Sequence, residues 1–247
     1  MAEEVLLTEK AENICTITIN RPERRNALNL DVLYRLGDTL NALKDDREVR
    51  VVVLRGAGEK AFSAGMDIGG IPTVAEETVK KGGNPIDYAM ESIISYPYPV
   101  IAMIYGAAMG AGCDLAVTCD LRIAADTARM GINPVKLGLV YPPAGIQRLI
   151  NVVGLPRAKE IGLVNLVVPA DELSSVTYAL AREIAENAPL AVSTTKTMFN
   201  KLLKYQRLSA EDEVEIMALL DSVMRSEDAK EGPMAFIQKR KPAFKGR

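Results

Sequence analysis

Two stretches of small residues, each directly after an apolar run, constrain this chain more than any other feature. They are Ala61–Asp67 (Ala-Phe-Ser-Ala-Gly-Met-Asp) and Gly106–Asp114 (Gly-Ala-Ala-Met-Gly-Ala-Gly-Cys-Asp). The runs before them, Val49–Leu54 and Pro99–Tyr105, are apolar in the way that strands buried on both faces are. Small residues in a turn after a strand let a ligand come close to main-chain N–H groups. Two such groups aimed at one point would form an oxyanion hole, so both stretches are candidate parts of one site.

The bulk composition is that of a globular protein able to fold without disulfides or metals. The chain has 247 residues, of which 48% are hydrophobic, enough for one domain or one domain with a helical extension. A formal net charge of −2 disfavours a nucleic-acid binder that works through bulk charge. The N-terminus lacks the pattern of an export signal, no apolar run has transmembrane length, and the cysteines number three. We therefore expect a cytoplasmic protein with reduced thiols.

The complete absence of histidine narrows the possible chemistry. It excludes Ser-His-Asp and Cys-His nucleophilic catalysis, the common zinc sites and any proton transfer by an imidazole. Carboxylates, tyrosine, lysine, cysteine and the backbone remain available. We expect no metal site.

Hydrophobic periodicity predicts an α/β fold with a layered core. Alternating residues at Ile14–Asn20 predict a strand, with Val5–Glu9 as its hairpin partner, and leucines at helical spacing predict a helix over Asn29–Lys44 that Asn29 caps. Further strands are expected at Val49–Leu54, Pro99–Tyr105 and Leu121–Ala125, and further helices around Leu115–Thr118 and at Leu173–Ala188 and Leu190–Ser226. The glycine- and proline-containing segment Gly69–Glu91, helical in pattern at Val74–Lys81, is expected to be mobile and to shape the substrate pocket.

A series of short motifs along the chain also carries a resemblance. The first motifs are Asn20-Arg21-Pro22, Asn26-Ala27-Leu28-Asn29 and the two small-residue stretches, of which the second continues to Cys119-Asp120. They are followed by Leu137-Gly138-Leu139, Gly145-Ile146-Gln147-Arg148-Leu149, Gly162-Leu163-Val164 and Glu231–Phe236. Together they resemble the crotonase, or enoyl-CoA hydratase/isomerase, superfamily. The resemblance implies a spiral of ββα units with a C-terminal helical oligomerisation region. It divides the chain into an acyl-CoA-binding core at 1–188 and a helical region at 189–247 for trimerisation and CoA contact.

The resemblance also implies partners and binding residues. The substrate would be an acyl-CoA thioester, so CoA enters as part of the substrate and no separate cofactor is expected. The assembly would be a homotrimer or a dimer of trimers. The backbone N–H groups of Ala64 and Ala111 would form the oxyanion hole, with Ala111 standing where the family usually has glycine. The residues implied in CoA binding are Arg24, Ala27, Gly65, Asp67, Ile68, Phe236 and Lys239, of which Arg24 and Lys239 have solvated surface charges as their alternative interpretation.

The implied catalytic residues depart from the family's pattern. Hydratases of this family use two glutamates, and the matching positions here hold Asp114 and Pro134. Asp114 either transfers protons or only stabilises the first turn of a helix. The stretch Pro134–Pro143, which contains Tyr141, resembles the corresponding stretch of a decarboxylase in the superfamily that also uses a histidine. Tyr141 either hydrogen-bonds a reacting group or packs against the two following prolines, and for Cys113 packing is favoured over nucleophilic catalysis.

These observations predict an enzyme that stabilises a thioester enolate. Reversible hydration of a 2-enoyl-CoA, with Asp114 and Tyr141 as catalytic residues, is the leading hypothesis. Decarboxylation or thioester hydrolysis on the same scaffold, or a non-catalytic protein that binds CoA or RNA, are the alternatives. The family's usual helix and turn are missing between Glu160 and Ile161. Either the chain lacks that element, which would open one side of the pocket, or residues are missing at this junction.

Overall fold

The computed structural model describes residues 4–67, 69, 83–132, 141–153, 165–186, 225–240 and 243, and the single residues 192, 196, 214, 218 and 221. Some expectations fall outside the described residues. These are Ile68, the helical pattern at Val74–Lys81, Pro134, the junction between Glu160 and Ile161, and most of the helix expected at Leu190–Ser226.

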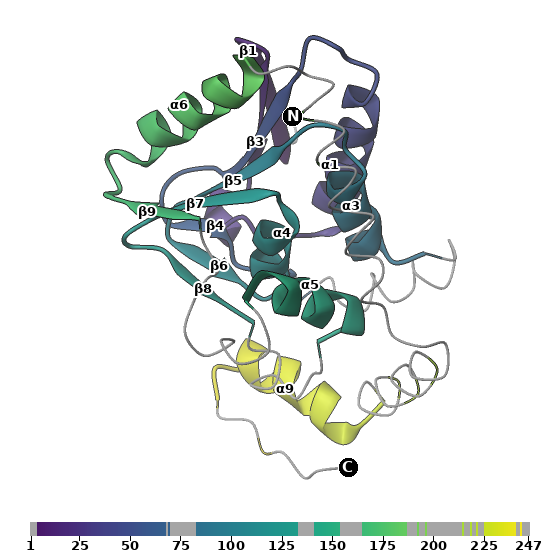
Figure 1. Cartoon of the computed structure of the whole chain (residues 1–247). Coiled ribbons are helices and arrows are strands. Elements are labelled where there is room, and N and C mark those ends of the chain that lie inside the picture. Colours follow the sequence, from purple (N-terminus) through teal and green to yellow (C-terminus); the bar gives the residue numbers. More distant parts are fainter. Residues whose placement is uncertain are drawn as a thin grey trace.

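A six-stranded sheet in the order β1-β2-β3-β5-β7-β9 forms the centre of the molecule (Figure 1). Its strands are β1 (Leu6–Ala11), β2 (Ile14–Ile19), β3 (Val51–Gly56), β5 (Val100–Ile104), β7 (Leu121–Ala125) and β9 (Leu166–Val168). β1 and β2 form an antiparallel hairpin, and every later neighbour in the sheet is parallel. The predicted α/β class is therefore confirmed.

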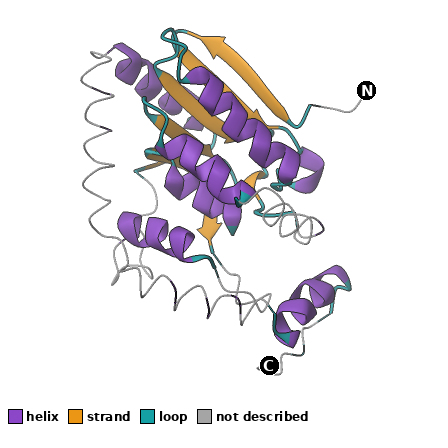
Figure 2. Ribbon diagram, turned by 90° about the vertical axis from the view of Figure 1, so that its right-hand side faces the viewer, coloured by secondary structure: helices purple, strands orange, loops and turns teal. Residues whose placement is uncertain are grey.

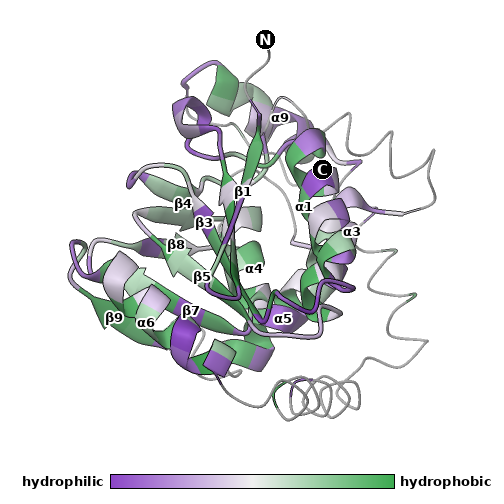
Figure 3. Cartoon of the chain, turned by 90° about the horizontal axis from the view of Figure 1, so that it is seen from above, coloured by the Kyte–Doolittle hydropathy of each residue, from purple (hydrophilic) through white to green (hydrophobic). Residues whose placement is uncertain are grey.

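Strand β3 shows how the sheet acquires two buried faces. Its side chains alternate, so that Val52 and Leu54 face one hydrophobic cluster while Val51 and Val53 face the other. The first cluster lies under α1 (Leu30–Leu43), α3 (Pro85–Ile94) and α4 (Ala111–Thr118), and the second under α6 (Leu173–Glu186). Figure 2 shows helices packed against the sheet, and Figure 3 shows the hydrophobic strands enclosed between α6 and the pair α1 and α3.

A second, three-stranded parallel sheet brings the two small-residue stretches together. It consists of β4 (Ala61–Ser63), β6 (Ala107–Met109) and β8 (Arg129–Gly131), with Ala61 opposite Ala107 and Ala107 opposite Arg129. Hydrophobic periodicity did not predict these strands, because three-residue segments of small side chains carry no clear alternation. The chain leaves β4 and β6 at adjacent points, so the segments that follow them meet (Figure 1).

Several expected elements can be compared directly with the structure. The Asn29 cap is confirmed, because its side-chain oxygen accepts a hydrogen bond from Val32 N at 3.0 Å. The strand expected at Val49–Leu54 begins two residues later, since Val49 N bonds to Asp46 O in the preceding turn. The expectation of a mobile segment up to Glu91 is partly wrong, because its last residues belong to α3, which Asn84 caps. Helix α5 (Pro143–Val153) was not predicted.

Helix α9 (Glu227–Ile237) lies far from β1 in Figure 1 and carries apolar side chains on its exposed surface. Ala229, Gly232 and Ala235 are its buried residues. The boundary expected near residue 188 stays a prediction. None of the helices in the described parts of the chain combines the length and apolar character that crossing a bilayer requires.

Candidate functional site

The site is built around the first turn of α4. Gly110 precedes the helix with φ 52° and ψ −121°, a conformation that a residue with a side chain rarely adopts. Gly112 lies against β4 so closely that an added Cβ would stand 2.5 Å from Ser63 O. Ala111 is the first helical residue, so its N–H group has no carbonyl partner within the helix and lies at the positive end of the helix dipole.

The loop after β4 lies against this helix terminus. Gly65 has φ +95°, and a Cβ placed on it would stand 2.6 Å from Met109 O and 3.4 Å from Ala111 N. The other side of the loop is held by Leu28, whose N–H group donates to Gly65 O at 2.8 Å and whose carbonyl accepts from Asp67 N at 2.9 Å. The two small-residue stretches therefore meet at the amino terminus of α4.

The amide available in this loop differs from the expected one. Ala64 N–H donates to Arg25 O at 2.9 Å, so the expectation that Ala64 supplies a free oxyanion donor is wrong. Met66 N–H donates to no atom within the described ranges of the chain. In the β-bridge between Met66 and Leu28, the amides that donate are those of Leu28 and Asp67. Matching along a motif cannot tell which of several successive amides in an irregular loop is left free.

Asp114, in the same first turn of α4, is held by two side chains. Arg148 forms a bidentate ion pair with it, Nε to Oδ1 at 2.8 Å and Nη2 to Oδ2 at 2.6 Å. Tyr141 Oη donates to Asp114 Oδ2 at 2.9 Å. The carboxylate is buried, and it accepts these bonds from side chains instead of capping the helix that carries it. The structure therefore brings the two expected catalytic side chains into contact.

One face of α5, together with the turn before it, contacts this carboxylate. Tyr141, Gly145 and Arg148 stand at i, i+4 and i+7, which places them on the same side of a helix. A Cβ on Gly145 would lie 2.1 Å from the Tyr141 ring, so only glycine leaves room for the phenol. Burial, together with the charge and hydrogen bond of Asp114, raises the pKa of Tyr141. The phenol consequently stays protonated and acts as a donor.

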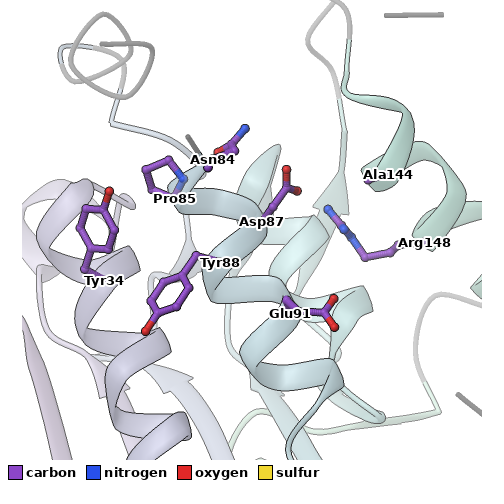
Figure 4. A pocket seen from close by; sticks show the side chains of 9 residues that line it. Tyr34, Asn84, Pro85, Asp87, Tyr88, Glu91, Ala144 and Arg148 are labelled. Atoms are coloured by element: carbon purple, nitrogen blue, oxygen red, sulfur yellow. The ribbon is translucent and has the colours of Figure 1, made fainter. Parts of the chain in front are cut away.

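A cavity of about 620 Å³ adjoins the ion pair, between α1, α3 and α5 (Figure 4). It is lined by Tyr34, Gly83, Asn84, Pro85, Asp87, Tyr88, Glu91, Ala144 and Arg148. Figure 4 shows the side chain of Asp87 directed toward Arg148. Burial raises the pKa of Asp87, although the nearby guanidinium opposes this rise. The cavity thus has two carboxylates and part of Arg148 on its wall.

The residues expected to bind CoA fall into two groups. Arg24 and Ala27 adjoin the loop after β4, where Arg24 is exposed at the end of the short 3-10 helix η1 (Pro22–Arg24) and Ala27 is buried. Asp67 is paired with Arg21 Nη2 at 2.9 Å, and Arg21 Nη1 also bonds Ala27 O at 2.7 Å. Gly65 lies in the same loop.

The second group lies at the end of α9, where Phe236 is 60% exposed and Lys239 is exposed with φ 54°. Cys113 is buried, which raises the pKa of its thiol to about 12 and leaves it a packing residue.

Two residues of the site were missed, Met66 and Arg148. Arg148 belongs to a motif that the sequence singled out, Gly145–Leu149, but without a role. The signal was its helical spacing from Tyr141, which becomes meaningful only once α5 is recognised.

The whole chain is similar to proteins of one family. The model of a family described as enoyl-CoA hydratase/isomerase matches residues 9–247. Short-chain-enoyl-CoA hydratase of Clostridium acetobutylicum is 35% identical over 261 residues, and the match covers 98% of this chain and 98% of that protein. Crotonyl-CoA hydratase of Syntrophomonas wolfei is 35% identical, and the match covers 99% of this chain and 99% of that protein.

Solved structures of the same kind are similar in fold. A methylmalonyl-CoA decarboxylase in complex with 2-nitronate-propionyl-CoA has a TM-score of 0.89 at 30% identity, covering 100% of both chains. An enoyl-CoA hydratase from Mycobacterium avium subsp. paratuberculosis has a TM-score of 0.81 at 27% identity, covering 98% of this chain and 99% of that one.

Proposed function

The chain belongs to the enoyl-CoA hydratase/isomerase family and has its fold, and from this premise we propose that it reversibly hydrates a 2-enoyl-CoA thioester. As a member of this family it is an acyl-CoA enzyme of the hydratase/isomerase type. The observation that carries the specific reaction is the Asp114–Tyr141 hydrogen bond near two backbone amides, Met66 and Ala111, that have no partner in the part of the chain that the structure describes. Hydration of an enoyl thioester needs groups that transfer protons and donors that stabilise the enolate oxygen, and these residues can supply both.

The amides of Met66 and Ala111 would stabilise the negative charge of the intermediate. When water adds to the β-carbon, electrons move to the thioester oxygen and give an enolate. Two fixed N–H donors stabilise that oxygen, and losing one of them typically costs about 3 kcal/mol of transition-state stabilisation. The dipole of α4 acts in the same sense at Ala111.

The Asp114–Tyr141 pair would handle the protons. Side chains on a helix tilt toward its amino terminus, so the Asp114 carboxylate lies over the turn that begins with Ala111. In this proposal the proton-transfer groups lie beside the oxyanion site. The reaction needs no resident cofactor, because CoA is part of the substrate.

Decarboxylation is the second candidate, favoured by the likeness to methylmalonyl-CoA decarboxylase. The charges near the site disfavour it. Arg148 is already paired with Asp114, and Asp87 and Glu91 add two further carboxylates on the cavity wall. A substrate that carries a free carboxylate would meet net repulsion there, whereas an enoyl group would not.

The test is a spectrophotometric assay of a series of 2-enoyl-CoA thioesters, followed at the enoyl-thioester absorption band. We expect the wild-type protein to consume the band and Asp114→Asn to lose about 10²- to 10⁴-fold in kcat, as for removal of a general acid–base group. Asp31→Asn, in an exposed ion pair on α1, is the matched control and should retain activity.

Two results would contradict the proposal. Release of CO₂ from a malonyl-type thioester with no loss of the enoyl band would establish the decarboxylase. Binding of CoA thioesters or RNA with no turnover of either substrate class would establish a non-catalytic binding protein.

We also propose that the protein forms a homotrimer or a dimer of trimers in the cytoplasm. Support comes from α9, where the apolar side chains of Met234, Phe236 and Ile237 are half or more exposed in the single chain. Phe236 and Lys239 would then contact CoA bound to a neighbouring subunit. Light scattering on the purified protein should give three or six times the chain mass of 26.8 kDa, and a monomeric mass would overturn the assembly.

A further inference from the structure

We infer that Arg148 is a positioning residue that occupies the Asp114 carboxylate, so that Tyr141 Oη, and not Asp114 itself, exchanges protons with water and substrate. This inference rests on the proposed hydration. It assigns the order in which the protons move and gives a role to Arg148, which the sequence singled out only as part of a motif.

The first step of the argument is the number of acceptor positions on Asp114. A carboxylate has about four lone-pair positions, two on each oxygen. Oδ2 accepts bonds from Arg148 Nη2 at 2.6 Å and from Tyr141 Oη at 2.9 Å, and Oδ1 accepts one from Arg148 Nε at 2.8 Å. Oδ2 therefore has no position left for a water molecule, and Oδ1 has one. Because the Asp114 side chain is only 1% exposed while Tyr141 is partly exposed, the phenol is the group of the pair that water reaches more easily.

The second step concerns the phenol. The single hydrogen of Tyr141 is donated to Asp114, so the lone pairs of Oη are what the hydroxyl offers to an incoming water. A water bonded to Oη would be aligned for a relay, because the phenol can pass its own proton to Oδ2 as it receives another. The raised pKa of Tyr141 disfavours a free phenolate, so both transfers must occur together.

In this relay every proton and electron pair is accounted for. The water oxygen bonds to the β-carbon, its proton moves to Oη, and the former phenol proton moves to Asp114 Oδ2. The electrons of the carbon–carbon double bond move to the thioester oxygen. The proton on Oδ2 then returns to Oη while Oη gives its proton to the α-carbon and the carbonyl forms again. Hydrogen and hydroxide have been added, and the protein ends as it began.

The third step is why arginine is needed. A guanidinium binds both carboxylate oxygens at once and fixes the plane of the carboxylate, which a lysine ammonium cannot do. That plane sets where the Tyr141 hydroxyl points. The other groups facing the pair are Asp87 on α3, which Arg148 also faces, and the buried thiol of Cys113 beside Asp114 on α4.

The experiment compares Tyr141→Phe, Arg148→Lys and Arg148→Ala for the kcat and KM of hydration. We expect Tyr141→Phe to lose at least 100-fold in kcat. Arg148→Lys should lose about 10-fold or more in kcat with little change in KM. Arg148→Ala should lose more in kcat than Arg148→Lys, because neither Asp114 oxygen then has a cationic donor to hold it in place. Arg35→Lys, in an exposed pair with Asp31, is the matched control and should change none of these.

Chemical rescue separates positioning from a merely structural role. The cavity of about 620 Å³ next to Arg148 leaves room for a free guanidinium ion to reach Asp114 in the Arg148→Ala variant. Millimolar guanidinium should restore kcat at least ten-fold, and methylammonium at the same concentration should restore much less. Unaltered circular dichroism would show that the variant is folded. If it is not folded, the kcat and KM of Arg148→Lys decide whether Arg148 positions the carboxylate.

The outcomes distinguish this inference from the proposed function. Should Tyr141→Phe keep kcat within three-fold while Asp114→Asn is inactive, the relay is wrong and hydration stands. Absence of rescue in a folded Arg148→Ala variant would remove the positioning role. If the wild-type protein hydrates no enoyl thioester, the function itself fails, and deuterium exchange at the α-carbon of a saturated acyl-CoA still reports whether Tyr141 moves protons.

Discussion

Single glycines decide whether the two loops of the site can meet. Gly65 combines a positive φ with a position in which any Cβ would stand 2.6 Å from Met109 O. Gly58 also has a positive φ, +70°, but an added Cβ would meet nothing within 4 Å. A side chain at either position would therefore strain the backbone, but only at Gly65 would it also collide with a neighbouring atom.

Gly65→Ala should destabilise the fold by about 2–4 kcal/mol, because left-handed strain and a backbone collision add together. Gly58→Ala should cost only about 1 kcal/mol, the strain alone. Urea unfolding of both variants measures the difference. The collision is refuted if the two variants unfold at the same urea concentration.

At the scale of whole elements, α1 and α4 show two ways of satisfying helix termini. α1 begins with a side-chain cap from Asn29. The carboxyl end of α4 is capped instead by buried Arg122, whose Nη1 donates to Cys119 O at 2.6 Å and to the carbonyls of Ala116 and Val117 at 3.4 Å. Burial lowers the pKa of this guanidinium, and the helix carbonyls offset part of its loss of hydration. At the amino terminus of α4, the Ala111 amide has no hydrogen-bond partner among the described residues, and this terminus is the one at the candidate site.

Removing the cap of α1 is a direct test of the helix boundary expected from the sequence. Asn29→Ala should lower the free energy of unfolding by about 1 kcal/mol, because Val32 N loses its acceptor. Asn29→Asp keeps an oxygen at the same place and should stay within a few tenths of a kcal/mol of the wild type. Chemical denaturation distinguishes them, and equal losses in both variants would contradict a capping role.

At the scale of the whole molecule, a buried lysine joins the C-terminal region to the core. Lys196 Nζ donates to Asp120 Oδ2 at 2.7 Å, to Tyr98 O at 3.0 Å and to Ile93 O at 3.3 Å. Asp120 Oδ2 also accepts from Val100 N at 2.7 Å at the start of β5. One ion pair therefore connects residues separated by 76 positions in the chain.

Lys196→Met should destabilise the protein by about 3 kcal/mol, because Asp120 and two carbonyls lose the cation that they face. The double variant Lys196→Met/Asp120→Asn should be destabilised by clearly less than the sum of the two single variants, as expected for side chains in contact. Additive losses in a double-mutant cycle would show that the pair is not coupled.

All three cysteines are free and buried, and this can be tested on the intact protein. Burial raises the pKa of Cys15 to about 11 and those of Cys113 and Cys119 to about 12. A thiol whose pKa lies well above the working pH stays protonated and reacts slowly. We expect no rapidly reacting thiol at pH 8 in the folded protein and three after denaturation, as measured with a disulfide reagent. A fast-reacting native thiol would contradict the burial.

Local patterns in the sequence were sufficient for much of the fold. β7 has the expected bounds, the hairpin β1–β2 pairs as expected, and the Asn29 cap lies where helical spacing placed it. These features depend on residues within a few positions of one another, which is the range over which propensity and periodicity act. The strands of the second sheet carry no such pattern and were missed.

The sequence by itself determined the α/β class, the order of the family's motifs, and the placement of Asp114 at the amino terminus of a helix. Only the tertiary structure decided that the Met66 amide, unlike that of Ala64, has no partner among the described residues, and that Arg148, 34 positions after Asp114, holds its carboxylate. The reason is physical. Which amide stays unbonded, and which distant side chain reaches a charge, depends on how separate elements pack, and local residue order does not encode that packing.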